Sequence, residues 1–153
     1  MRKLIPYGRQ SISKDDINSV IKALRSDFLT TGPLTKKFET KFKSYVGSKY
    51  AITCSSGTSA LHLALMSLNI KKGDIVIFPV INFIASINMS HILGAKIYFA
   101  DVNKITGQMT PRNLETCIKK NGLKKIKAVV TMYNGGNPNF AREFFILKKK
   151  YNF

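Results

Sequence analysis

The sequence predicts an α/β fold with a mostly parallel sheet covered by helices on both faces. Short, nearly continuous apolar runs alternate with segments in which apolar residues recur at helical spacing. Strands of that kind are typical of parallel sheets whose two faces are both buried. The length of 153 residues and the 44% share of hydrophobic residues suit one packed domain or part of a larger protein.

Two helices are expected before the first strand. Ser13 and Asp16 form a capping box ahead of apolar residues at helical spacing, which predicts the start of a helix. Pro33 suits the first turn of a second helix, and Gly47 is a suitable end. The segment 27–32 between them is predicted to be a loop.

Strands and helices then alternate to the end of the chain. Thr110 and Pro111 give cap and first-turn signals for one of these helices. The predicted strands are residues 50–54, 75–79, 96–102 and 127–133. The predicted helices follow the turn at 55–59, span about 83–93, begin at 110–111 and contain 144–147. Residues 1–48 are therefore expected to be a helical segment, and residues 49–153 an α/β domain that breaks off where a further strand is due.

The charge of the chain is strongly basic. There are 25 Lys and Arg residues against 8 Asp and Glu, which gives a formal net charge of +17. A basic nucleic-acid-binding protein is therefore one alternative. The charges are spread evenly, however, and Lys outnumbers Arg 20 to 5. Because Arg is the preferred reader of phosphates and bases, compositional bias is the favoured interpretation and nucleic acid an unlikely partner.

Cysteine use and hydropathy indicate a cytoplasmic protein. Cys54 and Cys117 lie far apart and outside any metal-binding pattern, so both are read as reduced thiols, and no metal site is expected. The apolar run at 75–81 is much shorter than the roughly 20 residues needed to span a bilayer. The first ten residues lack the apolar stretch of a signal peptide.

The stretch CSSGTSAL at residues 54–61 is the most informative motif. It contains four hydroxyl side chains, a glycine and the free N–H groups of a helix start, which together suit a phosphate. It lacks the lysine of a nucleoside triphosphate loop and the glycines of a dinucleotide loop. An ordinary Ser/Thr-rich helix cap and a non-catalytic phosphate- or nucleotide-binding domain remain the alternatives.

Phe83 follows the predicted strand at 75–79 and begins a helix. The carboxyl ends of parallel strands line one crevice, so its ring could stack on a flat ligand held by the phosphate motif. The alternative is a plain core residue. His62 and His91 are expected to be structural or solvated, and no catalytic set of amino acids can be assembled from the sequence.

Six blocks in a fixed order carry a family resemblance over nearly the whole chain. They are IPYGRQSI, SDFLTTGP with an acidic helix residue soon after it, CSSGTSALHLAL, FPVINFIASIN, GAKIYFADVN, and GNPN followed by a helix. Together they resemble the start of the sugar-nucleotide aminotransferases of the DegT/DnrJ/EryC1/StrS family, which use pyridoxal 5′-phosphate (PLP). The resemblance implies the N-terminal part of the large domain of the aspartate-aminotransferase type I fold, apparently truncated.

The resemblance also implies roles for particular residues. The cofactor-binding residues would be Ser56, Gly57 and Thr58 on the phosphate and Phe83 on the pyridine ring. The residues near the substrate would be Thr30, Thr31 and Gly32, at an expected homodimer interface, together with Tyr7 and Arg9.

The implied reaction moves an amino group from glutamate to C4 of a UDP-4-keto-6-deoxy-N-acetylhexosamine. This is nucleotide-sugar biosynthesis of the pseudaminic acid type, which serves cell-surface polysaccharides. The family's Schiff-base lysine and the acid that pairs with the pyridinium nitrogen are expected beyond Phe153, and Lys96 and Lys104 match no lysine motif. No catalytic residue is therefore assigned, and the chain alone is expected to be inactive.

Overall fold

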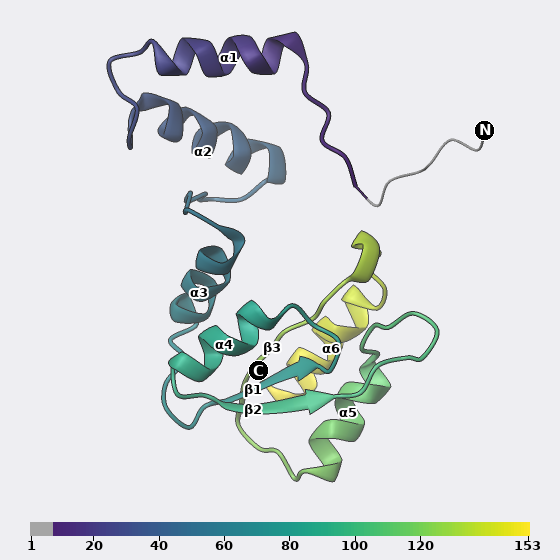
Figure 1. Cartoon of the computed structure of the whole chain (residues 1–153). Helices are drawn as coiled ribbons and strands as arrows, with labels where there is room; N and C mark the ends of the chain where they lie inside the picture. The colour runs from purple at the N-terminus through teal and green to yellow at the C-terminus, as the bar shows by residue number, and fades with distance from the viewer. Residues whose placement is uncertain (1–7) are drawn as a thin grey trace, which may run out of the picture. The chain divides into compact units, whose positions relative to one another are not determined.

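The computed structural model describes residues 8–153, which form two compact units, one ending at Thr53 and the other beginning at Cys54. The first unit is helical and the second holds the sheet (Figure 1). The helices are α1 (Lys14–Leu24), α2 (Pro33–Val46), α3 (Gly57–Ser67), α4 (Ile84–Ile92), α5 (Pro111–Lys120) and α6 (Ala141–Tyr151), with a 3-10 turn η1 at Asn134–Gly136. The strands are β1 (Ile75–Pro79), β2 (Lys96–Ala100) and β3 (Ile126–Val129).

The two predicted helices of the first unit are confirmed with their end signals. The Ser13 hydroxyl accepts a hydrogen bond from the Asp16 N–H at 3.2 Å, and the Asp16 carboxylate accepts one from the Ser13 N–H at 2.7 Å. Pro33 is the first residue of α2, and Gly47 ends it in the left-handed conformation at φ 68°. Neither helix contains a buried residue.

The predicted strand at residues 50–54 is wrong, because none of these residues forms a strand. A strand requires a neighbour for its backbone hydrogen bonds. Among residues 8–153 this segment has no ladder partner, and the Thr53 N–H donates instead to the Glu39 carboxylate at 2.8 Å. The Ile52 side chain, expected in a core, is 81% exposed.

The sheet has the strand order β2-β1-β3, and both pairings are parallel, which confirms the predicted architecture. β3 is shorter than the predicted strand at 127–133. Ile77 of β1 lies opposite Val129, so two residues further on β1 has reached its last residue, Pro79. Proline has no N–H to donate, and the ladder between the two strands ends there.

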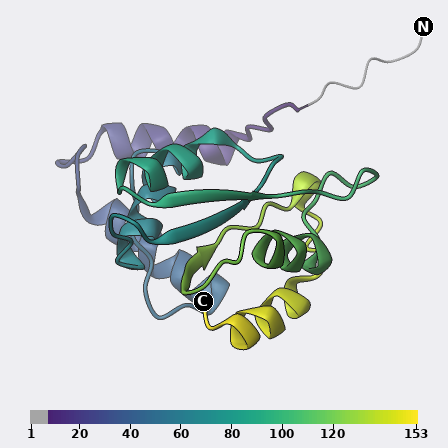
Figure 2. The same cartoon turned by 90° about the horizontal axis from the view of Figure 1, so that it is seen from below.

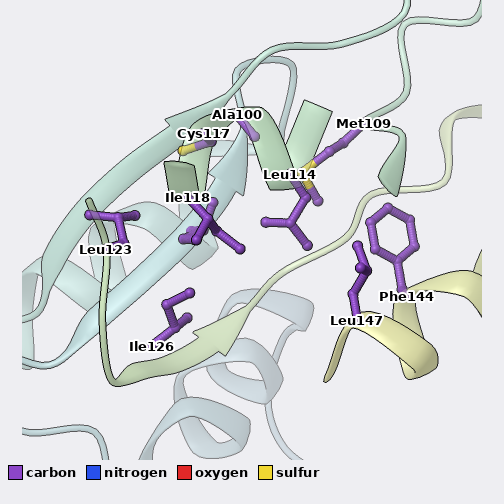
Figure 3. Close-up of a cluster of buried hydrophobic side chains, with 10 residues drawn as sticks. Ala100, Met109, Leu114, Cys117, Ile118, Leu123, Ile126, Phe144 and Leu147 are labelled. Atoms are coloured by element: carbon purple, nitrogen blue, oxygen red, sulfur yellow. The ribbon is translucent and has the colours of Figure 1, made fainter. Parts of the chain in front are cut away.

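Helices cover both faces of the sheet, with α4 on one side and α5 and α6 on the other (Figure 2). The alternation of side chains along β1 divides the core accordingly. Ile77 packs with residues of α5 and α6, including Leu114, Ile118 and Phe144, whose side chains converge in Figure 3. Val76 and Phe78 point the other way and pack with Leu65 of α3 and with α4.

Candidate functional site

The start of α3 is a cluster of hydroxyl groups. Ser56 is the N-cap, and its Oγ accepts a hydrogen bond from the Ser59 N–H at 3.1 Å. The Ser59 hydroxyl lies 3.0 Å from the Ser56 hydroxyl and 3.2 Å from that of Ser55. The short motif therefore folds back on itself and gathers three hydroxyls at one helix end.

Two backbone donors at this helix end are free. Among residues 8–153, the N–H groups of Gly57 and Thr58 have no hydrogen-bond partner. The first turn of α3 contains no acidic side chain that would occupy its positive end. A Cβ added at Gly57 would meet no heavy atom within 4 Å, so an anion has room to approach the backbone. These donors and this open space fit a phosphate group.

Phe83 lies at the corresponding position of the next helix. It is the N-cap residue of α4, immediately before Ile84, and its side chain is 62% exposed. Its interpretation as a plain core residue is therefore wrong. α3 and α4 pack together on one face of the sheet, so Ser56 and Phe83 lie at the starts of two neighbouring helices. An exposed ring at a helix start is available for stacking on a flat ligand.

The loops that follow β2 and β3 are tied together at the carboxyl ends of the strands. The Asn134 amide donates to the Gly107 carbonyl at 3.1 Å. Gln108 is buried, and its Nε2 donates to the carbonyls of Asn134 and Asn137, both at 3.2 Å. The sequence did not indicate Gln108, because its partners are 26 and 29 positions away. It joins the loop after β2 to the loop after β3.

The residues expected near a substrate lie in the first unit. Thr30, Thr31 and Gly32 form the loop before α2, with Thr31 in the left-handed conformation at φ 45°. Gly32 is required by packing, since a Cβ there would lie 2.7 Å from the Cβ of Phe28. A cavity of about 300 Å³ lies against Phe28 and this loop.

The two remaining substrate candidates precede α1. Arg9 is exposed. Tyr7 lies outside the described residues.

Glu39, the acidic helix residue that follows SDFLTTGP, bonds to Thr53, which precedes the phosphate motif in the sequence. Its Oε1 accepts from the Thr53 N–H at 2.8 Å and from the Thr53 hydroxyl at 2.9 Å. These two hydrogen bonds, the backbone one first, hold the pKa of the Glu39 carboxyl below its ordinary value. Glu39 therefore stays ionised at neutral pH and acts as a charged acceptor.

Other candidate chemistry is sparse in residues 8–153. His62 lies in α3 and His91 in α4, as expected for histidines on helices. No three His, Cys, Asp or Glu side chains of these residues gather as a metal site. None of the helices described has both the length and the apolar character to span a membrane.

Comparison with known proteins gives one family and several solved structures. The model of the DegT/DnrJ/EryC1/StrS aminotransferase family matches residues 10–144. An uncharacterized protein of Methanocaldococcus jannaschii is 36% identical over 148 residues, which are 97% of this chain and 37% of that protein. This chain thus spans about 37% of the length of that curated relative.

Two solved structures share the fold. An aminotransferase from Psychrobacter cryohalolentis is 33% identical, with a TM-score of 0.84 over 96% of this chain and 37% of that one. The E. coli GDP-4-keto-6-deoxy-D-mannose-3-dehydratase, solved with bound hydrated PLP, is 27% identical, with a TM-score of 0.84 over 94% of this chain and 38% of that one. PLP is therefore the cofactor of a solved protein that this chain resembles along nearly all of its length.

The parallel sheet of this chain, with helices on both faces, matches the N-terminal part of these PLP-dependent proteins. Neither a general nucleotide binder nor a nucleic-acid-binding protein gains support from these matches. With the family model covering residues 10–144, the chain belongs to the DegT/DnrJ/EryC1/StrS aminotransferase family.

Proposed function

We propose that this chain binds PLP, with the phosphate at the start of α3 and the pyridine ring against Phe83. The observation that carries the proposal is the pair of free N–H groups at Gly57 and Thr58, surrounded by hydroxyls and without a nearby acid in the first turn. The bound PLP of the dehydratase that shares this fold supports the choice of cofactor.

Each residue has a defined task in this proposal. The N–H groups of Gly57 and Thr58 and the hydroxyl of Ser56 donate hydrogen bonds to phosphate oxygens, helped by the positive end of the helix dipole. The exposed ring of Phe83 covers one face of the pyridine and excludes water from it. When bound, PLP supplies an electron sink for the transfer of an amino group.

The proposed substrate is a UDP-4-keto-6-deoxy-N-acetylhexosamine, with glutamate as the amino donor. Within the family this is the reaction of UDP-4-amino-4,6-dideoxy-N-acetyl-β-L-altrosamine transaminase, of the pseudaminic acid type. The name of the E. coli dehydratase supports a 4-keto-6-deoxy sugar linked to a nucleotide as the substrate class. Thr30, Thr31 and Gly32 are the proposed contacts, and Arg9 and Tyr7 are further candidates for substrate contact.

The state of the active protein is also a proposal. The chain is proposed to work as part of a homodimer in the cytoplasm. Residues 1–153 alone are proposed to bind PLP without completing the transfer, because Lys96 and Lys104 match no lysine motif of the family. Turnover of a 4-keto sugar nucleotide by these residues alone would contradict that part of the proposal.

Gly57→Ala tests the cofactor site directly. In the free protein the added methyl group meets nothing within 4 Å, so folding should be unaffected, whereas a bound phosphate would collide with it. We expect the Kd for PLP, measured by calorimetry, to rise at least about tenfold, or about 1.4 kcal/mol. The Kd for pyridoxal, which has no phosphate, should not change.

Ser67→Ala at the other end of α3 is the matched control, since within residues 8–153 the Ser67 hydroxyl bonds only to the Ala64 carbonyl, at 2.7 Å. It should leave both dissociation constants as in the unchanged chain. Equal affinity of the unchanged chain for PLP and pyridoxal would show that the chain has no phosphate site. If Gly57→Ala binds PLP as tightly as the unchanged chain does, the phosphate site does not lie at Gly57.

A further inference from the structure

Phe83 begins α4 without the side-chain cap that several other helices of the chain have. It is the N-cap residue, and within residues 8–153 no side-chain hydrogen bond caps this helix start. The N-caps of α1, α3 and α5 are Ser13, Ser56 and Thr110, and each of their side chains accepts a backbone N–H. A phenylalanine cannot cap a helix in this way, so its position breaks a local preference. Exceptions of this kind are most often found at functional or strained sites.

Two polar side chains hold the backbone at Phe83 instead. The Ser86 hydroxyl donates to the Phe83 carbonyl at 3.4 Å and accepts from the Asn82 side-chain amide at 3.2 Å. Ser86 is only 2% exposed, so water does not compete for these two rather long hydrogen bonds. Asn82, Phe83 and Ser86 are therefore tied into one turn, with the Ser86 hydroxyl at its centre.

Burial sets Ser86 apart from other helix serines that bond back to a carbonyl. Ser19, Ser44 and Ser67 donate to carbonyls three or four positions earlier, and all three are exposed. Bonds of that kind are common in helices and have no particular meaning. Ser86 is buried, has a second partner, and bonds to the residue that carries the candidate stacking ring.

The Phe83 ring depends on this turn for its direction. Its side chain is 62% exposed, so packing against neighbours does little to orient it. Ala85 and Ser86 are buried, which fixes the first turn of α4. The hydrogen bond between Ser86 and Asn82 extends that order to the residue before Phe83. The backbone that bears the ring is thereby held on both sides.

We propose that Ser86 is a positioning residue for the cofactor ring, which acts through Phe83. By holding the Phe83 carbonyl and the Asn82 amide, the buried hydroxyl sets the direction from which the exposed ring covers the pyridine. This inference rests on the proposed PLP site. It adds a residue of α4 to that site and assigns it no contact with the cofactor.

The anchor is tested first without a ligand, by the NMR resonance of the Phe83 carbonyl carbon in the full chain. Ser86→Ala removes the donor, so this resonance should move upfield, whereas Ser86→Thr keeps a hydroxyl and should leave it close to its original position. Ser90→Ala is the matched control, because Ser90 is also a buried serine of α4, but within residues 8–153 its hydroxyl has no hydrogen-bond partner. An unmoved Phe83 resonance in Ser86→Ala would overturn the inference, whatever the protein binds.

Affinity then tests the link to the cofactor ring, with PLP and pyridoxal as probes. Both contain the pyridine ring, so Ser86→Ala should raise both dissociation constants at least about threefold, within the roughly two- to tenfold that an aromatic contact contributes. Gly57→Ala should instead weaken PLP alone. Asn82→Ala leaves the bond from Ser86 to Phe83 in place and should fall between Ser86→Ala and the unchanged chain. Ser90→Ala should leave both constants unchanged.

A double variant shows whether Ser86 acts through Phe83. In a chain that already carries Phe83→Ala, the change Ser86→Ala should cause no further loss of affinity, because the ring that it positions is gone. A further loss as large as the one measured with Phe83 present would overturn the positioning role, since Ser86 would then act on the site by another route.

The two proposals fail in different ways. If the unchanged chain binds neither PLP nor pyridoxal, the proposed function fails and Ser86 has no cofactor ring to position. If the unchanged chain prefers PLP to pyridoxal and Ser86→Ala weakens neither, the positioning role alone is overturned. Should Ser86→Ala not fold, Asn82→Ala at a half-buried residue carries the affinity measurement and the double variant, and unchanged binding of both probes there overturns the role.

Discussion

The strand β1 and the helices α1 and α2 differ sharply in burial. Four of the five residues of β1 are buried, whereas α1 and α2 contain no buried residue. Both helices have well-formed ends and an apolar stripe, so local signals suffice to define them. Burial depends on a second surface, and the sheet has helices on both faces to provide it. In this sequence, regular secondary structure therefore forms even where no residue is buried, and a packed core requires a second surface as well.

Truncation of an aromatic side chain in each region should give the largest difference. Phe78 is fully buried in β1, and Phe78→Ala should lower the free energy of unfolding by about 3–5 kcal/mol because it leaves a cavity. Phe42 in α2 is 48% exposed and stacks on Phe38, at 5.7 Å between ring centroids. Phe42→Ala should therefore cost about 1 kcal/mol or less in urea unfolding. If both variants lost the same free energy of unfolding, Phe42 of α2 would be as buried in solution as Phe78 of β1.

Loss of a capping residue should give a smaller difference. Thr110 and Asn113 form a capping box at α5, whose residues Leu114 and Ile118 belong to the core. Thr110→Ala should lower the free energy of unfolding by about 1 kcal/mol. Ser13→Ala removes the equivalent box of α1, which has no buried residue, so its effect should be confined to faster amide exchange in the first turn. A fall in global stability with Ser13→Ala would show that α1 and the core unfold together.

The smallest effect is expected from the ion pair that joins α5 and α6. Glu115 accepts from the Lys150 ammonium at 2.6 Å and from the Tyr151 hydroxyl at 2.9 Å, and these bonds lower the pKa of Glu115 below its ordinary 4.5. The bond to Glu115 also raises the pKa of Lys150 above its ordinary 10.5. The ion pair therefore contributes fully to the stability of the folded chain between pH 4.5 and pH 10.5, the ordinary pKa values of the two groups. It is lost as the pH falls through the folded pKa of Glu115 or rises through that of Lys150.

Lys150→Ala tests this pair by NMR titration of the Glu115 carboxyl. Its pKa should move up toward 4.5 but stay below it, because the Tyr151 hydroxyl still donates. Lys149→Ala, one residue earlier on α6, is the matched control and should leave the titration unchanged. An unchanged Glu115 titration in Lys150→Ala would show that this exposed pair is not formed in solution.

Local signals in the sequence predicted much of the fold. The capping box at Ser13, the N-cap at Thr110, the first-turn prolines Pro33 and Pro111 and the end at Gly47 are all at the expected positions. Each depends on residues within a few positions of one another. The failed strand at 50–54 depends instead on a partner elsewhere, and an apolar run alone does not supply one.

The same distinction applies to the candidate site. Ser56 and Phe83 stand at helix starts as predicted, because the signals for both starts lie within a few residues of them. Glu39 and Gln108 bond to residues 14 to 29 positions away, so no short motif identifies their partners. Contacts of that range become visible only when the chain is folded.

The two cysteines differ in a way that has a practical use. Cys117 is buried in α5, and burial raises the pKa of its thiol, so it should resist alkylation at neutral pH. Cys54 is exposed and lies two residues before Ser56. A maleimide fluorophore should therefore attach to Cys54 alone, which would give a native reporter of events at the start of α3 without any engineered mutation.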